Sequence, residues 1–545
     1  MPTEPTDSFD RLSTAELIES ARGLLAEVVR LRSENESLRR ELAQLKIDHQ
    51  AVKDELARLK KLPPRPPIKP SGMEKSTSAV EREGKGKEQK GAKRPRGPVH
   101  DRLKITATVV VKTEAPAGSR RKGYEDIVVQ DLSLNATVTL YRRERWETPE
   151  GETVVAGLDR GIVGGFGPNL HRQVLQLHSQ GQMTCERIVA WLNDIGVMIS
   201  KRQVVRLLTT KMETFRAEDA EVLKAGLMGD YVSADDTGAR HAGKSGYTTQ
   251  IGSDRFCVFR TGPSKSRLAF LSRLNGGSSL YVINQPALDY MKERALPDVV
   301  IAKFADMKER IFASKDAWEN CLTELGFYEM KGALDPVMIA SEGALWGAIR
   351  HQGLLERAVI LSDDAGQFCV GQHALCWVHA ERLVHKLVPA NEQQRNAVDN
   401  AKRMIWWFYR QLKDYKLAPT PERAEILRSR FERIFKRART GYASLDRLLK
   451  RLHANGRELL LVLARPEIPL NTNASESDIR TVVTKRKISG GTVSEKGREA
   501  RDVMLGLYKT CKKLGIPFYQ FLGDRLGIPG PKIPPLPTLV RPNTS

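Results

Sequence analysis

Cysteine is scarce in this chain of 545 residues, and the six cysteines are scattered along it. Such sparse thiols give no disulfide framework, which is typical of a protein in a reducing compartment. Long apolar runs are also missing, because none approaches the ~18 residues that a membrane span needs. The polar, acidic start MPTEPTDSFD is not a signal peptide. We therefore expect a cytoplasmic protein with no membrane partner.

Acidic residues are too few to balance the basic ones, with 66 Asp and Glu against 88 Lys and Arg. The formal net charge is +22 and the isoelectric point is about 9.7. At this size the excess points to a polyanionic partner, most often nucleic acid, and a generally basic soluble protein is the alternative. The length fits two to four domains with a substantial core.

The start of the chain repeats every seven positions, which predicts a dimerising coiled coil, a leucine zipper, over residues 1–62. One core position runs from Leu17 to Leu59 and is leucine at nearly every step, while Asn35 occupies the other core position. Acidic g positions followed by basic e positions favour a parallel homodimer. The alternative is a long amphipathic helix packed on its own domain.

Three further segments, residues 63–102, 103–158 and 529–545, are recognised by their composition. Residues 63–102 are rich in Pro, Gly and Lys without an apolar period, which predicts a disordered basic linker. Residues 103–158 contain alternating and β-branched runs between turn residues, which predicts a small β-rich domain. Residues 529–545 read as a Pro-rich tail.

Residues 159–222 read as a helical DNA-binding region that contains a helix-turn-helix. The segment ERIVAWLNDIG ends at Gly196, and a second helix restarts at Ser200, a good N-terminal cap. The outward face of the second helix would carry Arg202, Gln203 and Arg206, whose side chains can reach base edges or phosphates. Many helical hairpins share this pattern without binding DNA.

Two apolar stretches of the remaining chain each run into a pair of aspartates. LMGDYVSADDTGAR leads to Asp235 and Asp236, two further strand candidates follow, and RAVILSDDAGQF leads to Asp363 and Asp364. A strand, a carboxylate at its end and then a meander is how a ribonuclease-H-like core begins. The end of a buried parallel strand is rigid and open to solvent, which suits a metal ligand. Taken singly, each Asp-Asp pair could equally be a turn.

A third carboxylate, Glu476, lies in the segment LNTNASESDIRTVVTKRK on a predicted helix. Arg480, one turn later, would share its helix face toward a DNA backbone. The basic residues that follow it would hold further phosphates: Lys485, Arg486 and Lys487. Three oxygen ligands from separate elements suit Mg²⁺ or Mn²⁺, and two such ions ~4 Å apart can assist a phosphoryl displacement.

At these residues the chain resembles the DDE transposases of the insertion-sequence-66 family. The resemblance rests on ADDTG at the first site, SDDAG at the second, the run CWVHAER, the segment NTNASESDIR and the downstream KRKISGG. It extends over roughly residues 160 to 525, and the ordered set is specific although each motif alone is weak.

The resemblance implies that Asp235, Asp363 and Glu476 are the catalytic residues and the ligands of two Mg²⁺ or Mn²⁺ ions. Asp236 and Asp364 are the near alternatives, because adjacent residues of a strand point to opposite faces. The implied reaction is strand cleavage at element ends by water, followed by attack of the freed 3′-hydroxyl on target DNA. The implied supporting residues are Asn473, Cys376, His379 and Arg382.

The fold class implied by these features is multidomain α/β. A ribonuclease-H-like DDE catalytic domain would extend over residues 223–528, with insertions near residues 275–350 and 380–465. Expected partners are the terminal repeats of the element, target DNA, a second copy of the chain and accessory proteins, in association with the bacterial nucleoid.

Several positions depart from the family pattern. Asn471 and Thr472 stand where the family has Asp and Asn, and Ser477 replaces an arginine. No Cys-x-x-Cys occurs, so the β-rich region would stand in place of a zinc module. Two other functions stay open: a catalytically silent DNA-binding protein derived from a transposase, and a structure-selective nuclease that does not join strands.

Two further segments suggest sites that we weigh lower. The set Cys369, His373, Cys376 and His379 is too compressed for an ordinary zinc finger. The segment MIWWFYR could stack on unpaired bases, but burial of Trp406 and Trp407 in a helical core is the better expectation.

Overall fold

The computed structural model describes residues 27, 28, 30, 31, 34, 105–112, 119, 120, 122, 124–158, 161–304, 307, 310–330, 334–436 and 439–541. The predicted coiled coil of residues 1–62 lies outside the described residues except for five helical positions, and the predicted linker of residues 63–102 lies wholly outside them. The coiled coil, the homodimer and the linker therefore stay predictions. In the described part of the chain, no helix combines the length and hydropathy that membrane crossing requires.

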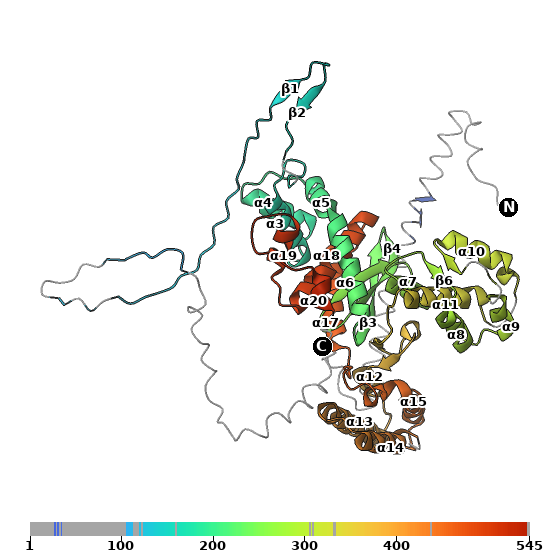
Figure 1. The fold of residues 1–545 in the computed structure, drawn as a ribbon. Coiled ribbons are helices and arrows are strands. Elements are labelled where there is room, and N and C mark those ends of the chain that lie inside the picture. The colour runs from blue at the N-terminus through green and yellow to red at the C-terminus, as the bar shows by residue number, and fades with distance from the viewer. Residues whose placement is uncertain are drawn as a thin grey trace.

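A mixed five-stranded sheet occupies the centre of the molecule (Figure 1). Its strand order is β5-β4-β3-β8-β9, in which β3, β4 and β5 form an antiparallel meander and β3, β8 and β9 run parallel. The strands are β3 (Tyr231–His241), β4 (Lys244–Gly252), β5 (Cys257–Gly262), β8 (Val359–Ser362) and β9 (His373–Leu375). The fold is thus multidomain α/β, and the predicted meander is present. The expectation that the first aspartate ends its strand is wrong, because Asp235 and Asp236 lie within β3 and pair with β4.

A two-residue turn joins β3 to β4 and sets the register of the meander. Ala242 and Gly243 both have positive φ, 47° and 76°, as a tight hairpin turn of this twist requires. The turn pairs Asp235 with Gln250 and Asp236 with Thr249 across the two strands. The strand environments of both aspartates therefore follow from this local turn.

The side chains of β8 point alternately into two different hydrophobic cores. Val359 and Leu361 belong to the core of the helical bundle, whereas Ile360 belongs to the main core. Because successive side chains of a strand point to opposite faces, one short apolar strand anchors both bodies of the protein.

Three long helices pack against the meander: α6 (Met212–Leu227), α17 (Asn473–Ser489) and α18 (Glu495–Lys513). Helix α18 approaches β5 so closely that a Cβ added at Gly506 would lie 3.1 Å from the Cys257 carbonyl oxygen. Glycine is needed there because a larger residue would push the helix away from the sheet.

Helices at the N-terminal side pack with the C-terminal end of the chain, as Figure 1 shows. They are α3 (Pro168–Ser179), α4 (Cys185–Asp194), α5 (Lys201–Thr209), α19 (Phe518–Arg525) and α20 (Leu536–Val540). Gly196, with φ of 87°, lies in the turn between α4 and α5, as the sequence predicts. The Pro-rich end is not a free tail up to residue 541, because Leu536 and Val540 are buried.

Residues 267–355 form a first helical unit beside the sheet (Figure 1). Its elements are α7 (Arg267–Leu274), β6 (Tyr281–Val282), α8 (Gln285–Glu293), α9 (Asp298–Ile301), β7 (Ile311–Phe312), α10 (Lys315–Glu324) and α11 (Pro336–His351). Trp318 is buried at its centre, stacked on Tyr281 with ring centroids 5.5 Å apart. Its place as an insertion into the catalytic core, expected near residues 275–350, stays a prediction.

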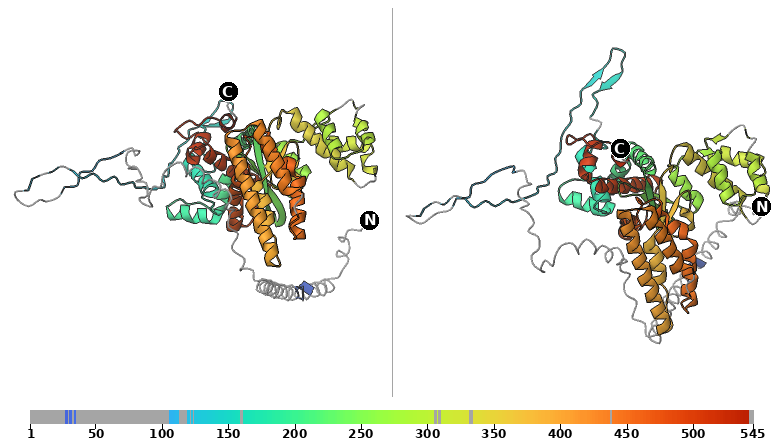
Figure 2. Two further views of the ribbon diagram at one scale, coloured as in Figure 1. Left: turned by 90° about the horizontal axis from the view of Figure 1, so that it is seen from below. Right: turned by 60° about the horizontal axis from the view of Figure 1, so that its bottom comes forward.

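A second helical unit, a bundle, stands apart from the first in the right view of Figure 2. Its helices are α12 (Trp377–His385), α13 (Glu392–Leu417), α14 (Pro421–Phe435), α15 (Ala443–Ala454) and the short α16 (Gly456–Leu459). Its aromatic core surrounds Trp377, which is 1% exposed. The burial expected of Trp406 and Trp407 is only partial, because Trp407 is 41% exposed.

The predicted β-rich domain over residues 103–158 is not a packed domain in the described residues. Only two three-residue strands occur there, β1 (Arg145–Glu147) and β2 (Thr153–Val155), which pair as a hairpin that projects from the body in Figure 1. Apolar side chains such as Val129 and Val138 are 80% and 97% exposed. The β-forming residue types are present, but strand propensity forms a core only where another layer covers one face.

Candidate active site

Asp235 and Asp363 lie at matching heights on neighbouring parallel strands. The register pairs Tyr231 with Val359 and Ser233 with Leu361, so the same offset aligns Asp235 with Asp363, the residue that follows β8. Adjacent strands are ~4.8 Å apart, so the two aspartates start from neighbouring backbone positions. Residues that are distant along the chain therefore meet at one end of β8.

The charges of this region act on Asp235. The pKa of Asp235 is raised to about 6: burial is the largest cause and the negative charges of Asp363 and Glu476 act in the same direction, whereas the hydrogen bond from the Asp236 N–H and the charge of His379 act to lower it. Carboxylates whose charges act on one buried carboxyl in this way belong to one electrostatic cluster. We call Asp235, Asp363 and Glu476 the carboxylate cluster.

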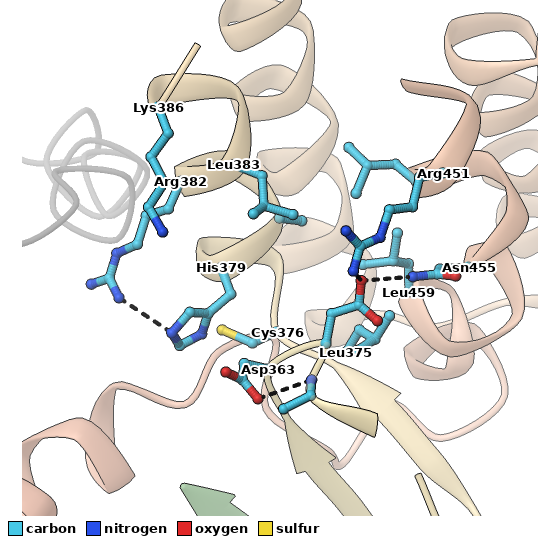
Figure 3. A pocket seen from close by; sticks show the side chains of 14 residues that line it. Asp363, Leu375, Cys376, His379, Arg382, Leu383, Lys386, Arg451, Asn455 and Leu459 are labelled. Atoms are coloured by element: carbon cyan, nitrogen blue, oxygen red, sulfur yellow. Dashed lines mark hydrogen bonds and ion pairs between the residues drawn. The ribbon is translucent and has the colours of Figure 1, made fainter. Parts of the chain in front are cut away.

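The neighbouring aspartates are committed to other contacts. Asp236 accepts hydrogen bonds from the Thr249 hydroxyl and from Gln367 Nε2, the latter at 3.1 Å. Asp364 forms an ion pair with Arg451 at 2.5 Å and accepts from Asn455 Nδ2 at 3.2 Å (Figure 3). The pleat and these partners turn Asp236 and Asp364 away from the carboxylate cluster.

Asp235 and Asp363 make mainly local contacts. Asp235 Oδ1 accepts from the Asp236 N–H at 2.8 Å, and Asp363 Oδ1 accepts from the Ala365 N–H at 3.2 Å. Such contacts with adjacent backbone orient a carboxylate without neutralising its charge. These two side chains thus keep the charge that a cation would need.

Glu476 lies in the first turn of α17, where the helix dipole favours a negative charge. Arg382 donates to both of its oxygens, from Nη1 to Oε1 and from Nη2 to Oε2, the second at 3.1 Å. His379 Nε2 lies 3.6 Å from Oε1 and Arg480 Nη2 lies 3.9 Å from Oε2. The carboxylate of Glu476 therefore faces three basic side chains.

The start of α12 holds these partners in place. Cys376 caps the helix and its Sγ accepts from the Thr472 N–H at 3.3 Å, which joins the beginnings of α12 and α17. His379 and Arg382 follow at a spacing of three residues, so both lie on the helix face toward Glu476. The predicted supporting residues of this segment thus surround one carboxylate.

Cys376 and His379 also influence each other. Burial acts to raise the pKa of Cys376, but hydrogen bonding to His379 and the charge of that ring outweigh burial and leave the pKa lowered. Burial acts to lower the pKa of His379, and the contact with Cys376 outweighs it and leaves the pKa raised. The pair therefore favours a positive imidazole beside Glu476.

The four residues of the compressed Cys-His set have different partners. Cys369 is exposed, whereas His373 shares a hydrogen bond of 2.8 Å with the Ser362 hydroxyl. Burial lowers the pKa of His373 to about 4. Across the part of the chain that the structure describes, no three His, Cys, Asp or Glu side chains are arranged to hold a metal ion.

The carboxylate cluster fits a hard divalent ion by its chemistry, since its donors are oxygens and its charges repel one another. Its present side-chain arrangement does not complete a ligand set, because Arg382 holds both oxygens of Glu476. A cation bound through Glu476 would have to share these oxygens with Arg382 or displace it.

The predicted DNA-binding residues of α5 differ in their availability. Arg202 and Arg206 are exposed. The Gln203 side chain accepts from the Ser200 N–H at 2.8 Å and so completes the cap of the helix. Two of the three side chains are thus free of the structural role that occupies the third.

The basic residues of α17 also differ in whether their side chains are exposed or used in contacts within the protein. Arg480 and Lys487 are exposed, Asn473 is exposed at the helix start, and Arg486 donates to the Gly238 carbonyl. Lys485 is 3% exposed, and its Nζ donates to the carbonyls of His178 and Met183 at 3.0 and 2.8 Å. The expectation that Lys485 holds phosphate is therefore wrong, because its ammonium is used to join α17 to the N-terminal helices.

Three residues of this region carry no motif that marks them in the sequence: Lys386, Arg451 and Asn455. They line a cavity beside Asp363, together with residues of the CWVHAER segment (Figure 3). The spacing of Arg451 and Asn455 at i and i+4 on α15 was a usable signal for a shared face. That this face contacts Asp364 and lines the cavity is decided by packing between distant segments.

Comparisons with known proteins give a family match and a relative. Residues 365–500 match the family model described as Transposase IS66 family. The matched segment contains Arg382 and Glu476 and begins just after Asp363. The chain is also 52% identical over 322 residues to a protein of Sinorhizobium fredii (strain NBRC 101917 / NGR234) described as "Uncharacterized protein y4jO". That alignment covers 58% of this chain and 99% of the relative.

Proposed function

The chain belongs to the IS66 family of transposases, and on this premise we propose that it cuts DNA at element ends and joins the freed 3′-hydroxyl to target DNA. One observation carries the proposal. The register of β3 and β8 aligns Asp235 with Asp363, and the charges of Asp363 and Glu476 both raise the pKa of Asp235. Acidic groups from three distant segments thus converge as this chemistry demands.

We interpret the central sheet as a ribonuclease-H-like core. It begins with the strand that carries Asp235, continues through an antiparallel meander, and then adds parallel strands, the first of which ends at the second aspartate. The third carboxylate comes from a helix that packs on the sheet. In this interpretation both helical insertions lie between the first aspartate and Glu476.

Asp235, Asp363 and Glu476 would hold Mg²⁺ or Mn²⁺, with two ions as the expectation. When bound, these ions activate an attacking oxygen and stabilise a leaving oxygen in phosphodiester chemistry. Asp235 on β3 and Asp363, directly after β8, would supply charge from the rigid sheet. Arg382 and His379 position the Glu476 side chain, and Arg480, at 63% side-chain exposure, can reach the DNA backbone from the same helix.

DNA would be recognised outside this cluster by α4 and α5, acting as a helix-turn-helix. The exposed Arg202 and Arg206 would contact base edges or phosphates, and the exposed Lys487 would add a backbone contact. The coiled coil of residues 1–62 would join two copies, so that two element ends could be held together.

A strand-joining assay tests the proposal. Wild type should convert a pre-cut terminal-repeat substrate with a free 3′-hydroxyl into joined product in Mg²⁺ or Mn²⁺. Asp363→Asn and Glu476→Gln should each lower the rate by at least about 100-fold, since even loss of a residue that only supports a metal ligand costs about 10–100-fold. Asp364→Asn makes the same change one residue away, where Arg451 is the partner, and should lower the rate far less than Asp363→Asn does.

The outcomes separate the alternatives. DNA binding with no product from wild type would identify a catalytically silent DNA-binding protein. Cleavage without joined product would identify a structure-selective nuclease. Equal loss in the Asp364→Asn and Asp363→Asn variants would contradict the assignment of Asp363.

A further inference from the structure

A small cavity adjoins the carboxylate cluster without containing all of it. The cavity has a volume of about 210 Å³ and lies between the end of β8 and the helices α12 and α15 (Figure 3). Asp363 lines it, whereas Asp235 and Glu476 do not. The space is therefore next to the proposed reaction centre and separate from it.

The walls of the cavity differ from its rim. Four leucines supply most of the apolar wall: Leu375, Leu383, Leu452 and Leu459. Cationic side chains from two helices stand around them: Arg382, Lys386 and Arg451. An apolar hollow with positive charges around it suits a flat apolar group attached to a polyanion.

One end of the cavity is polar and fixed. Asp364 is held there by Arg451 and by Asn455, which lie one turn apart on α15 (Figure 3). The ion pair ties the helical bundle to the end of β8. The polar groups at this end can exchange hydrogen bonds with the edge of a ring whose faces lie against leucine.

We propose that this cavity receives one unpaired nucleobase of the DNA strand whose phosphodiester lies at the carboxylate cluster. The inference rests on the proposed function for the position of that strand. The base leaves the duplex stack beside the scissile phosphate, and the exposed Lys386 holds a phosphate that flanks it.

The size of the cavity selects a single ring system. A dry apolar cavity of about 150 Å³ can hold benzene, and sites for drug-sized ligands are about 300–1,000 Å³. The observed 210 Å³ lies between these values. A nucleobase fits this interval, whereas a whole nucleotide with its sugar and phosphate would extend to the charged rim.

The charge of the cavity excludes simpler occupants. A free anion would meet the carboxylates of Asp363 and Asp364 and four leucine side chains. A free cation would meet the three basic side chains of the rim. A neutral base joined to a phosphate backbone meets neither obstacle, because its ring enters the apolar part while its phosphates stay at the rim.

Moving a base from the duplex into the cavity costs free energy, and this cost is lowest when the base is already unpaired. Extruding a paired base costs the lost stacking and pairing, and this cost is least for a mismatched or unpaired base. The wild-type protein should therefore bind a duplex with one unpaired base more tightly than a fully paired duplex of the same sequence, by about tenfold.

The test measures equilibrium binding to two probes without metal. One probe is a duplex with a single 2-aminopurine opposite an abasic site, and the other pairs the same 2-aminopurine with thymine. Wild type should prefer the first probe by about tenfold, with a change in 2-aminopurine fluorescence on binding. Leu383→Trp fills the cavity from α12 and should abolish both the preference and the fluorescence change.

Two further variants keep the test decisive. Leu387→Trp makes the same change one turn further along, at a half-buried leucine that does not line the cavity, and should keep the preference. Asn455→Trp fills the cavity from α15 and should behave like Leu383→Trp if the latter does not fold. Equal affinity of wild type for both probes, or a preference that survives in a folded cavity-filled variant, overturns the inference.

Failure of this inference is distinguishable from failure of the proposed function. The binding assay contains chelator and requires no strand cleavage, whereas the joining assay requires metal and product. Joined product without a preference for the unpaired probe overturns the cavity assignment alone. A preference for that probe without joined product supports the base site and overturns the catalytic proposal.

Discussion

At the scale of single residues, the contact between Arg382 and Glu476 controls the candidate metal site. The guanidinium donates to both carboxylate oxygens, and both side chains are mostly buried, at 28% and 17% exposure. A divalent ion and Arg382 would thus compete for the same two oxygens.

Replacement of Arg382 should strengthen divalent-ion binding. In Arg382→Ala, Glu476 loses its main competitor and the site loses one positive charge, so Mn²⁺ should bind about 3- to 10-fold more tightly. Calorimetric titration of Mn²⁺ without DNA measures this change. Lys386→Ala removes an exposed cation one turn away and should change the affinity less. Weaker Mn²⁺ binding in Arg382→Ala would show that Arg382 supports the site rather than competing for it.

Lys485 shows how burial changes the role of a basic residue. Burial lowers the pKa of Lys485 to about 8, with the charge of Arg501 acting in the same direction. The folded pKa lies below the unfolded value, so the unfolded chain binds more protons between pH 8 and about 10.4. This residue therefore makes the folded state more stable as the pH rises through that range.

The pH dependence of Lys485 can be isolated by substitution. Between pH 7.5 and 9.5, the free energy of unfolding of wild type should rise relative to that of Lys485→Met by about 2 kcal/mol. Urea denaturation at the two pH values measures the difference. Lys487→Met alters an exposed lysine of the same helix and should leave the pH dependence unchanged. A pH-independent difference between wild type and Lys485→Met would contradict the lowered pKa.

At the scale of elements, Trp377 connects the helical bundle to the site. It directly follows Cys376, and its Nε1 donates to the Leu459 carbonyl at 2.9 Å. The centroid of a ring of Trp377 lies 5.4 Å from that of Phe408 and 6.3 Å from that of Phe431. The bundle core therefore determines where α12 begins, and hence where His379 and Arg382 point.

Removal of the Trp377 ring should be costly for stability. Trp377→Ala should lower the free energy of unfolding by about 3–5 kcal/mol, because it opens a cavity and leaves the Leu459 carbonyl without this donor. Trp407→Ala removes a ring that is 41% exposed and should cost much less. Chemical denaturation followed by circular dichroism compares the two. Equal losses would show that the bundle core is not centred on Trp377.

Residues 103–158 show that strand propensity alone does not produce a packed β domain. Their alternation predicts strands, yet the described residues form one short hairpin whose side chains are exposed. A strand pattern specifies which side chains share a face, but it does not supply the layer that buries that face.

At the scale of the whole molecule, the charge of +22 should appear in the salt dependence of DNA binding. If Arg202 and Arg206 both contact phosphates, the double variant to alanine should reduce the slope of log Kd against log salt by about 2. Fluorescence anisotropy with duplex DNA at several salt concentrations measures the slope. Lys485→Met should leave it unchanged because that side chain is buried. An unchanged slope in the double variant would place the DNA elsewhere.

The sequence by itself determined the order of the acidic motifs, the strand that leads to each aspartate pair, the helices that carry Glu476 and Arg382, and the family. These features are local, because periodicity and capping act over a few residues. Tertiary structure decided which aspartate of each pair joins the carboxylate cluster, that Arg382 holds Glu476, that Lys485 is buried, and that a cavity adjoins Asp363. Such outcomes depend on strand register and on packing between distant segments, which set the distances that no local pattern contains.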